Sequence, residues 1–247
     1  FAGALAVSTS TGAGATIVAM VINKQVEALA EKLGTVTVNG NVTVNAQSKD
    51  TVVLLALAFA GGGNMGIAGD VNVLVFQSTT KALLGTTSTL KTSGKVDVLA
   101  NADSTLVHIG AGVAVGGSTG AVAVAVVTYF YNHAEGAITC GTVNAGGHVT
   151  VRATSKEFVT ADAAGVGAGG ATAVGGTLDV IVTKVETLAY TGNNVTITGN
   201  NITIQGVDKY DLVAVVATAA LSGSVGVAVS ALVSVSYNNV SAVVGQQ

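Results

Sequence analysis

The sequence predicts an all-β protein, a parallel β-solenoid (β-helix) built from about 4.6 copies of a unit of about 53 residues. Three observations predict this fold: an alternating motif that recurs at nearly constant spacing, a composition that favours strands, and Gly-rich breaks between apolar runs. Stacked units of this kind bury a continuous core only by packing on their neighbours.

The recurring motif begins with Gly or Asn and then alternates apolar and polar residues. Its four copies are Gly40-x-Val42-x-Val44-x-Ala46, Gly94-x-Val96-x-Val98-x-Ala100, Gly147-x-Val149-x-Val151-x-Ala153 and Asn200-x-Ile202-x-Ile204-x-Gly206. They follow one another at spacings of 54, 53 and 53 residues. Such alternation is typical of a half-buried strand, and the leading Gly or Asn suits a tight turn. The whole chain, 1–247, is therefore one repetitive segment, with repeats 40–93, 94–146 and 147–199 and partial repeats 1–39 and 200–247.

Charged residues recur in the same register, in two zones of each unit. The first zone contains Lys49, Asp50, Asp103, Lys156, Glu157, Asp208 and Lys209. The second contains Lys24, Glu27, Lys81, Glu135, Lys184 and Glu186. We expect both zones to form exposed corners between strands. This pattern leaves open whether one unit makes two short coils or one wide coil.

Nearly uncharged runs follow the Gly-rich breaks at 61–63, 110–120, 165–176 and 223–226. The runs are residues 17–22, 71–76, 121–127, 178–182 and 229–235, and they are apolar at both odd and even positions. This pattern is typical of strands buried on both faces, either in a covered parallel sheet or at a lateral contact between chains.

The composition argues against several classes of protein. Charged residues make up 9% of the chain against about 25% in an ordinary domain, and Gly numbers 33 while Pro and Trp are absent. The ten basic residues are scattered, so we expect no nucleic-acid partner. The uncharged stretch 212–247 is long enough for a membrane helix, but polar breaks at 222–224 and 237–239 interrupt a β-like pattern. We therefore expect no transmembrane helix.

The two ends of the chain fall inside units. Residues 1–33 resemble the second half of a unit, and Gln247 lies shortly after the second charged zone of another. Residues 1–22 have no basic start, so they do not resemble a signal peptide. We expect an interior stretch of something longer or self-assembling.

Motifs that could support chemistry have plainer explanations. Gly165-x-Gly167-x-x-Gly170 matches a dinucleotide fingerprint only formally, because no βαβ unit surrounds it. The stretch 61–70 resembles a calcium-binding β-roll, but the column of Asp70 is not acidic in other units. The three histidines, His108, His133 and His148, show no ligand spacing. We expect no catalytic residue, no cofactor and no metal.

Cys140 and one aromatic cluster complete the candidate residues. Cys140 is the single cysteine, so we expect a buried, inert thiol and no intrachain disulfide. Tyr129, Phe130 and Tyr131 form the one aromatic cluster of the sequence, and they are the candidate ligand contacts.

The repeats resemble those of a known family. The motifs are Ala145-Gly146-Gly147-His148-Val149-Thr150-Val151-Arg152-Ala153-Thr154-Ser155, Gly117-Ser118-Thr119-Gly120-Ala121-Val122-Ala123-Val124 and Thr79-Thr80-Lys81-Ala82-Leu83-Leu84-Gly85. Together they are similar to the repeat region of large bacterial leukotoxin-type filamentous adhesins and haemagglutinin-like repetitive exoproteins. The resemblance covers the whole chain and implies secretion to the bacterial cell surface, a β-helical stalk, and no catalytic residue.

The expected function is therefore a structural stalk or filament segment of a secreted bacterial surface adhesin, and not an enzyme. Its expected partner is the chain itself, through lateral or end-to-end association. The alternative is a binding module that recognises a host glycan or protein on one face of the solenoid. A polysaccharide-active β-helix is less favoured, because the carboxylates recur in register without a groove pattern.

Overall fold

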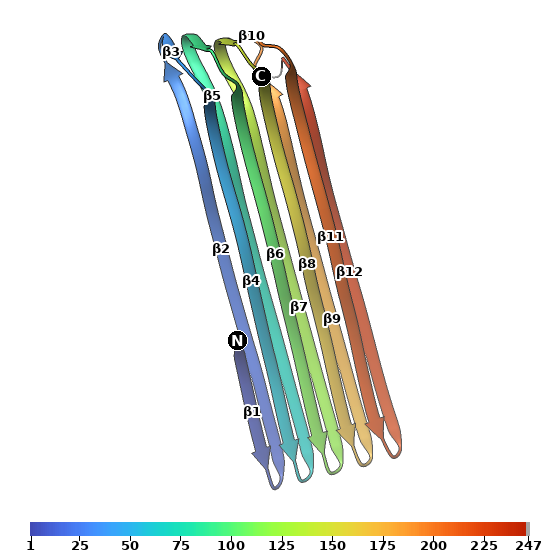
Figure 1. Cartoon of the computed structure of the whole chain (residues 1–247). Coiled ribbons are helices and arrows are strands. Elements are labelled where there is room, and N and C mark those ends of the chain that lie inside the picture. The colour runs from blue at the N-terminus through green and yellow to red at the C-terminus, as the bar shows by residue number, and fades with distance from the viewer. Residues whose placement is uncertain (246–247) are drawn as a thin grey trace.

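The chain folds into strands stacked in two parallel sheets, which confirms the predicted all-β parallel solenoid (Figure 1). The computed structural model describes residues 1–245, apart from the side chains of residues 86 and 87. The strands are β1 (Ala2–Ser8), β2 (Thr11–Leu33), β3 (Val36–Val38), β4 (Val42–Gly62), β5 (Met65–Thr92), β6 (Val96–Gly116), β7 (Thr119–Ala145), β8 (Val149–Gly169), β9 (Thr172–Thr191), β10 (Val195–Thr198), β11 (Ile202–Ser222) and β12 (Val225–Val244).

Each repeat forms one wide coil, which answers the question that the sequence left open. The first sheet has the order β1-β4-β6-β8-β11, and the second has the order β12-β9-β7-β5-β2. Each strand pairs in parallel with the equivalent strand of the next coil, at the spacing of about 4.8 Å that backbone hydrogen bonds impose. The strands are long, with 21 residues in β4 and 28 in β5, because they run on through the charged zones. The Gly-rich breaks contain the turns at the narrow end, as where β4 ends at Gly62 and β5 begins at Met65.

The repeated motif becomes a ladder across the first sheet. Val42 pairs with Val96, Val96 with Val149, and Val149 with Ile202. Parallel pairing in register keeps every side chain of a column on one side of its sheet. The alternation therefore directs one column into the core and the next outward, in coil after coil.

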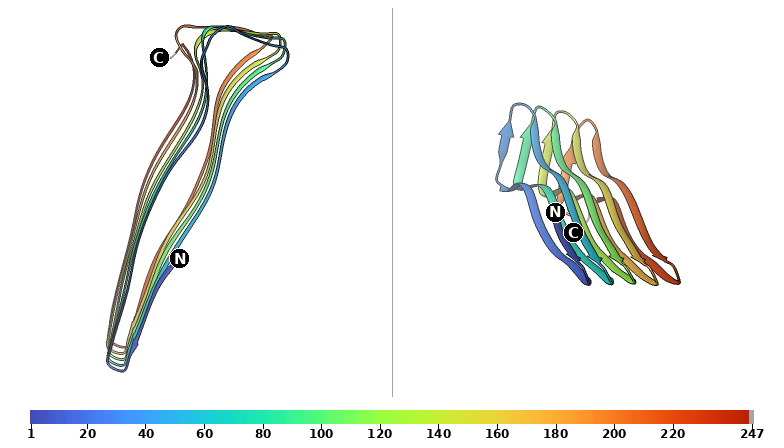
Figure 2. Two further views of the ribbon diagram at one scale, coloured as in Figure 1. Left: turned by 90° about the vertical axis from the view of Figure 1, so that its left-hand side faces the viewer. Right: turned by 90° about the horizontal axis from the view of Figure 1, so that it is seen from below.

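The two sheets approach closely at one end of the coil, where the interior is filled by Gly, Ala and Val (Figure 2). A Cβ atom at Gly66 would lie 2.3 Å from the carbonyl oxygen of Val115, and one at Gly120 would lie 2.1 Å from that of Ala168. Small residues are thus required here, because the backbones of the two sheets nearly touch.

The interior widens away from this narrow end. A middle cluster of larger side chains includes Leu54, Leu74, Phe76 and Leu106. Beyond it the coil closes through a short third side, formed by β3, β10 and the last residues of β5 and β7 (Figure 2). The size of the inward side chains therefore follows the distance between the sheets.

The charged zones are not corners, as the sequence suggested. Both zones lie in the middle of unbroken strands, so that alternate members point outward and inward. Lys24 on β2 and Asp50 on β4 face each other across the interior, with Nζ 2.6 Å from Oδ1. The two zones of a unit thus lie at the same level of one coil, because β2 and β4 run on opposite sides of it.

Four of the five doubly apolar runs turn one face inward and the other outward, and the fifth, residues 229–235 on β12, is exposed at both odd and even positions. Ile17 and Val21 on β2 keep 79% and 73% of their surface exposed, and Val71 on β5 keeps 42%. Their neighbours at even positions point into the core. The prediction of burial on both faces is wrong for the isolated chain, and the outward apolar rows remain on its surface.

Candidate functional site

The aromatic cluster predicted from the sequence is divided by the alternation of β7. Phe130 points into the core with no exposed surface and stacks on Phe76, with ring centroids 5.2 Å apart and planes inclined by 7°. Tyr129 and Tyr131 point outward. Phe130 is therefore a core residue that cannot contact a ligand on the surface, while Tyr131 belongs to a larger polar group.

This group, which we call the outer cluster, lies on the outer face of the second sheet. It consists of Lys81 from β5; Tyr131, His133 and Glu135 from β7; and Lys184, Glu186 and Tyr190 from β9. The three strands are neighbours, and outward side chains recur at every second residue along each strand. Side chains from different coils therefore meet although about 53 residues separate them in the sequence.

Glu135 is the most enclosed member of the outer cluster. Its Oε2 atom lies 2.9 Å from Nζ of Lys81 and 3.1 Å from Nε2 of His133. The hydroxyl group of Tyr190 donates a hydrogen bond of 2.7 Å to Oε1. The hydrogen bond with His133, with those from Tyr190 and Lys81, lowers the pKa of Glu135 to about 2 although burial opposes this. Glu135 is therefore ionised at neutral pH.

Glu186 forms a second centre beside it. Tyr131 donates a hydrogen bond of 2.8 Å to Oε2, and Lys184 lies 3.1 Å from Oε1. The Nδ1 atom of His133 lies 3.4 Å from the same Oε2 atom, so this imidazole ring lies between the two carboxylates. Burial raises the pKa of Glu186, but the hydrogen bonds from Tyr131 and Lys184 outweigh it, and the net shift is downward.

The outer cluster suits recognition better than proton transfer. A pair of carboxyl groups that hydrolyses glycosidic bonds requires one member with a raised pKa, whereas the pKa values of both Glu135 and Glu186 are lowered. The ammonium group of Lys184 lies 5.3 Å from the centre of the Tyr131 ring. The surface thus offers an aromatic ring, carboxylate acceptors and ammonium donors side by side.

The sequence indicated part of this cluster. Lys81, Glu135, Lys184 and Glu186 belong to the second charged zone of the sequence. Tyr190 was missed. Tyr190 pairs with Ala137, which lies two residues beyond Glu135 on β7, so the 53-residue offset between repeats places it beside Glu135. Finding it requires the strand pairing of the coils, which the charge pattern alone does not supply.

Other candidate residues have structural roles. Gly165, from the formal dinucleotide motif, faces Thr177 across the narrow interior, where a Cβ atom would lie 3.0 Å from Oγ1. Cys140 was expected to be buried, but it lies exposed at the wide end of β7, where the chain bends. His148 is exposed, whereas His108 is fully buried and its Nδ1 atom lies 2.8 Å from Oγ1 of Thr128.

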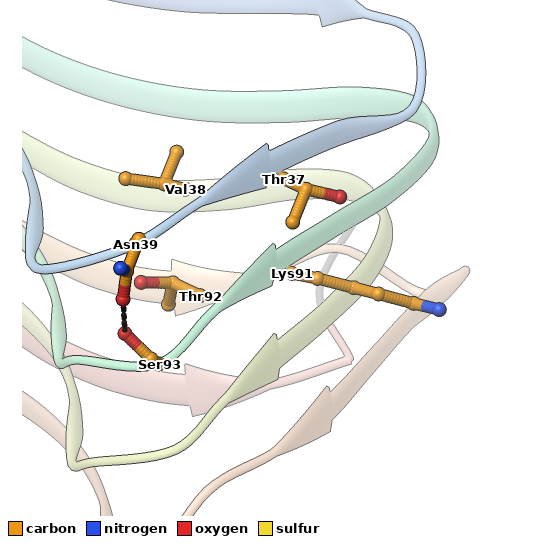
Figure 3. Close-up of a pocket in the computed structure, with 6 residues that line it drawn as sticks. All are labelled: Thr37, Val38, Asn39, Lys91, Thr92 and Ser93. Atoms are coloured by element: carbon orange, nitrogen blue, oxygen red, sulfur yellow. Dashed lines mark hydrogen bonds between the residues drawn. The ribbon is translucent and has the colours of Figure 1, made fainter.

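A depression of ≈ 290 Å³ lies on the short third side, between the first two complete turns of the chain (Figure 3). Thr37 and Val38 of β3 line it together with Lys91 of β5 and the turn that follows. Figure 3 shows Ser93 and Asn39 joined by a hydrogen bond, 2.9 Å long, with the Lys91 side chain directed away. This contact is a rung between coils and leaves few groups to bind a ligand.

Two further findings concern the part of the chain that the structure describes. Within residues 1–245, no helix has the length and apolar character needed to cross a membrane. In the same range no three His, Cys, Asp or Glu side chains gather around one point that could hold a metal ion.

No protein-family model, curated protein or solved structure matches this chain.

Proposed function

We propose that the chain is a structural stalk or filament segment of a secreted bacterial surface adhesin, and that it associates with copies of itself. The observation that supports this proposal is the unbroken register of the ladders. Along β4, β6, β8 and β11, each residue of one coil pairs with its equivalent in the next over about twenty positions. A stack of this kind gains length with each coil and resists pulling through many parallel hydrogen bonds.

The outward apolar rows support the self-association part of the proposal. On the second sheet they include Ile17, Ile67, Val71, Val174 and Leu178, and on the first sheet Val53, Phe59, Val115, Val213 and Val215. Extended apolar rows of this kind on a soluble protein are typical of contact surfaces. Sheets with such rows are suited to pack face to face against another stalk.

Electron microscopy and force spectroscopy of the purified chain test the stalk. We expect rods or bundles, and stretching should release one coil at a time, each adding about 18 nm of extended chain. Round particles, or one single unfolding event for the whole chain, would contradict the stalk. A chain that stays monomeric at high concentration without detergent would contradict the self-association separately.

A binding module for host glycans is the second candidate, and the outer cluster specifically favours it. The Tyr131 ring can stack on the apolar face of a sugar, while Glu186 and Lys184 supply hydrogen bonds at its edge. The test is binding to an array of animal-cell surface glycans. Tyr131→Ala should weaken binding at least about tenfold, the effect of losing one good aromatic contact.

The matched control is Tyr237→Ala. Tyr237 is an outward tyrosine of β12, in the column of Tyr131 and Lys184, but it lies outside the outer cluster. Equal binding by the two variants, or no binding by the wild-type chain, would rule out this role for the outer cluster.

A further inference from the structure

We propose that the interior of the solenoid binds one calcium ion between its third and fourth coils, through Asn132, Glu157 and Asp208. The proposal is independent of the stalk function. At the same level of successive coils, the inward residues of the two charged zones face each other across the interior.

These facing residues form a layer through the stack, which we call the mid-coil polar layer. Pairing between strands aligns Lys24, Ser78 and Asn132 on one side of the interior. It aligns Asp50, Ser104 and Glu157 on the other side. Each coil therefore places one residue from each side at the same level, and the pairs Lys24–Asp50, Ser78–Ser104 and Asn132–Glu157 can be compared directly.

The first pair is electrically balanced. The ammonium group of Lys24 lies 2.6 Å from Oδ1 of Asp50, and the hydroxyl group of Ser48 donates a hydrogen bond of 2.7 Å to Oδ2. A buried carboxylate requires a compensating charge and hydrogen bonds of this kind. The second pair consists of two hydroxyl groups and carries no charge.

The third pair lacks this balance. Asn132 occupies the position of Lys24, and its Nδ2 atom donates a hydrogen bond of 2.5 Å to Oε1 of Glu157. An amide supplies no positive charge, although Glu157 is only 1% exposed. The next coil adds Asp208, which pairs with Ser155, the residue two positions before Glu157. Two carboxyl groups thus meet where the first coil has one carboxylate and one ammonium group.

Four oxygen atoms of these neighbouring residues have no hydrogen-bond partner among the described residues. They are Oδ1 of Asn132, Oγ of Ser155, Oε2 of Glu157 and Oδ1 of Asp208, and each is shielded from solvent. Asn132 itself has no exposed surface. Buried polar atoms without partners are rare in folded proteins, and they indicate a missing water or ion. All of the atoms concerned are acceptors when the carboxyl groups are ionised, so they call for a cation or a proton.

The surrounding lysines cannot supply the charge. Lys156 and Lys209 flank the two carboxyl groups in sequence but point outward from the first sheet and are exposed. Lys209 lies 3.3 Å from Asp211 on that surface. Glu157 is buried and Asp208 comes from the next coil beside it, so a second negative charge at this place calls for a cation.

The donor set selects the kind of cation. Two carboxylates and an amide oxygen, with the hydroxyl group of Ser155 beside them, are hard oxygen ligands without nitrogen or sulfur. Ca²⁺ takes six to eight oxygens in irregular arrangements and accepts both oxygens of one carboxylate. Two bidentate carboxylates with the amide and hydroxyl oxygens would reach the lower end of that range, whereas Mg²⁺ demands a near-ideal octahedron and keeps several of its water molecules.

Calorimetry and thermal unfolding of the whole chain, refolded with Ca²⁺ because the site is enclosed, test this inference. We expect one Ca²⁺ per chain and, at a concentration of 100 times the Kd, a rise in melting temperature of roughly 5–10 °C over the EDTA form. Mg²⁺ should give a much smaller rise. The double variant Glu157→Gln, Asp208→Asn should lose both the binding and the rise.

Asp211→Asn is the matched control, because Asp211 is an exposed carboxylate of the same strand as Asp208, and it should keep the full rise. The double variant removes buried charge without changing side-chain size, so its melting temperature in EDTA should equal or exceed that of the wild-type chain. No stoichiometric Ca²⁺ in the wild-type chain overturns the inference. A rise retained by the double variant also overturns it, as does a melting temperature that responds to pH but not to Ca²⁺, which would assign a shared proton to the site.

Discussion

The narrow end and the middle of the coil are built from the same strands, yet they accept different side chains. At the narrow end Gly66 and Gly120 leave no room for even one carbon atom, because a facing carbonyl group lies against them. In the middle, ten residues further along β5 and β7, the interior holds the stacked rings of Phe76 and Phe130. The difference teaches that the distance between the sheets, and not the alternation, determines which residue a position tolerates.

The largest expected effect tests the middle of the coil. Phe130→Ala removes a fully buried ring and leaves Phe76 facing a cavity, because neighbouring coils hold both backbones in place. We expect a loss of about 4 kcal/mol in the free energy of unfolding, measured by urea denaturation. Phe158→Ala is the control, since Phe158 points outward from β8 and is 42% exposed. Similar losses in both variants would mean that the middle is not tightly packed.

The second prediction tests the narrow end. In Gly120→Val the new side chain must displace the backbone at Ala168, so we expect a loss of about 3 kcal/mol, at the upper end of overpacking effects. Gly176→Val is the matched control. Gly176 lies on β9 with open space at its Cβ position, and its partner on β12 is Val229. Its free energy of unfolding should stay equal or rise. If Gly120→Val is as stable as the wild-type chain, the narrow end is not rigid.

The smallest expected effect concerns the buried imidazole of His108 in the wider interior and the free energy of unfolding that its burial costs. Burial lowers the pKa of His108 from an ordinary value of 6.5 to about 4. Between these values the unfolded chain binds a proton that the folded chain does not, so stability falls as the pH falls through this window. Leu54 occupies the equivalent position in the preceding coil, so Leu is a suitable replacement for His108. His108→Leu should remove about 2 kcal/mol of the fall in the free energy of unfolding between pH 6 and pH 4.5.

The effect of His108 is isolated by comparing the wild-type chain with the His108→Leu variant in the pH dependence of their free energies of unfolding. Burial raises the pKa of Asp70 to about 6, and burial with the charge of Asp162 raises that of Asp179 to about 7. These carboxyl groups make stability fall as the pH rises, and they do so in both proteins. Urea denaturation at several pH values gives the comparison. Identical pH profiles would show that His108 becomes protonated in the folded state.

The repeat and its in-register stacking could be predicted, because the motif at Val42, Val96, Val149 and Ile202 recurs at a spacing that one coil imposes. The position of the charged zones could not. Strands usually have five or six residues, so charges between Gly-rich breaks suggested corners, whereas these strands run on through the charged zones and turn at the Gly-rich breaks.

The direction of individual side chains was also beyond the sequence. Runs that are apolar at odd and even positions do not reveal which parity faces the core. Phe130 and Tyr131 were therefore grouped, although one is a core residue and the other belongs to the outer cluster. The parity of β7 becomes visible only in the folded chain, where Gly120 points inward against the backbone of Ala168.

The bend near the wide end has a consequence for how such a chain can change over generations. Residues of β5 and β7 pair at an offset of 54 as far as Leu84, and at 53 from Thr89 onward. One residue is absorbed there without disturbing the columns on either side. A repeat can therefore gain or lose one residue at this bend while the strands on both sides keep their pairing register. Length differences between related coils should therefore gather at this bend.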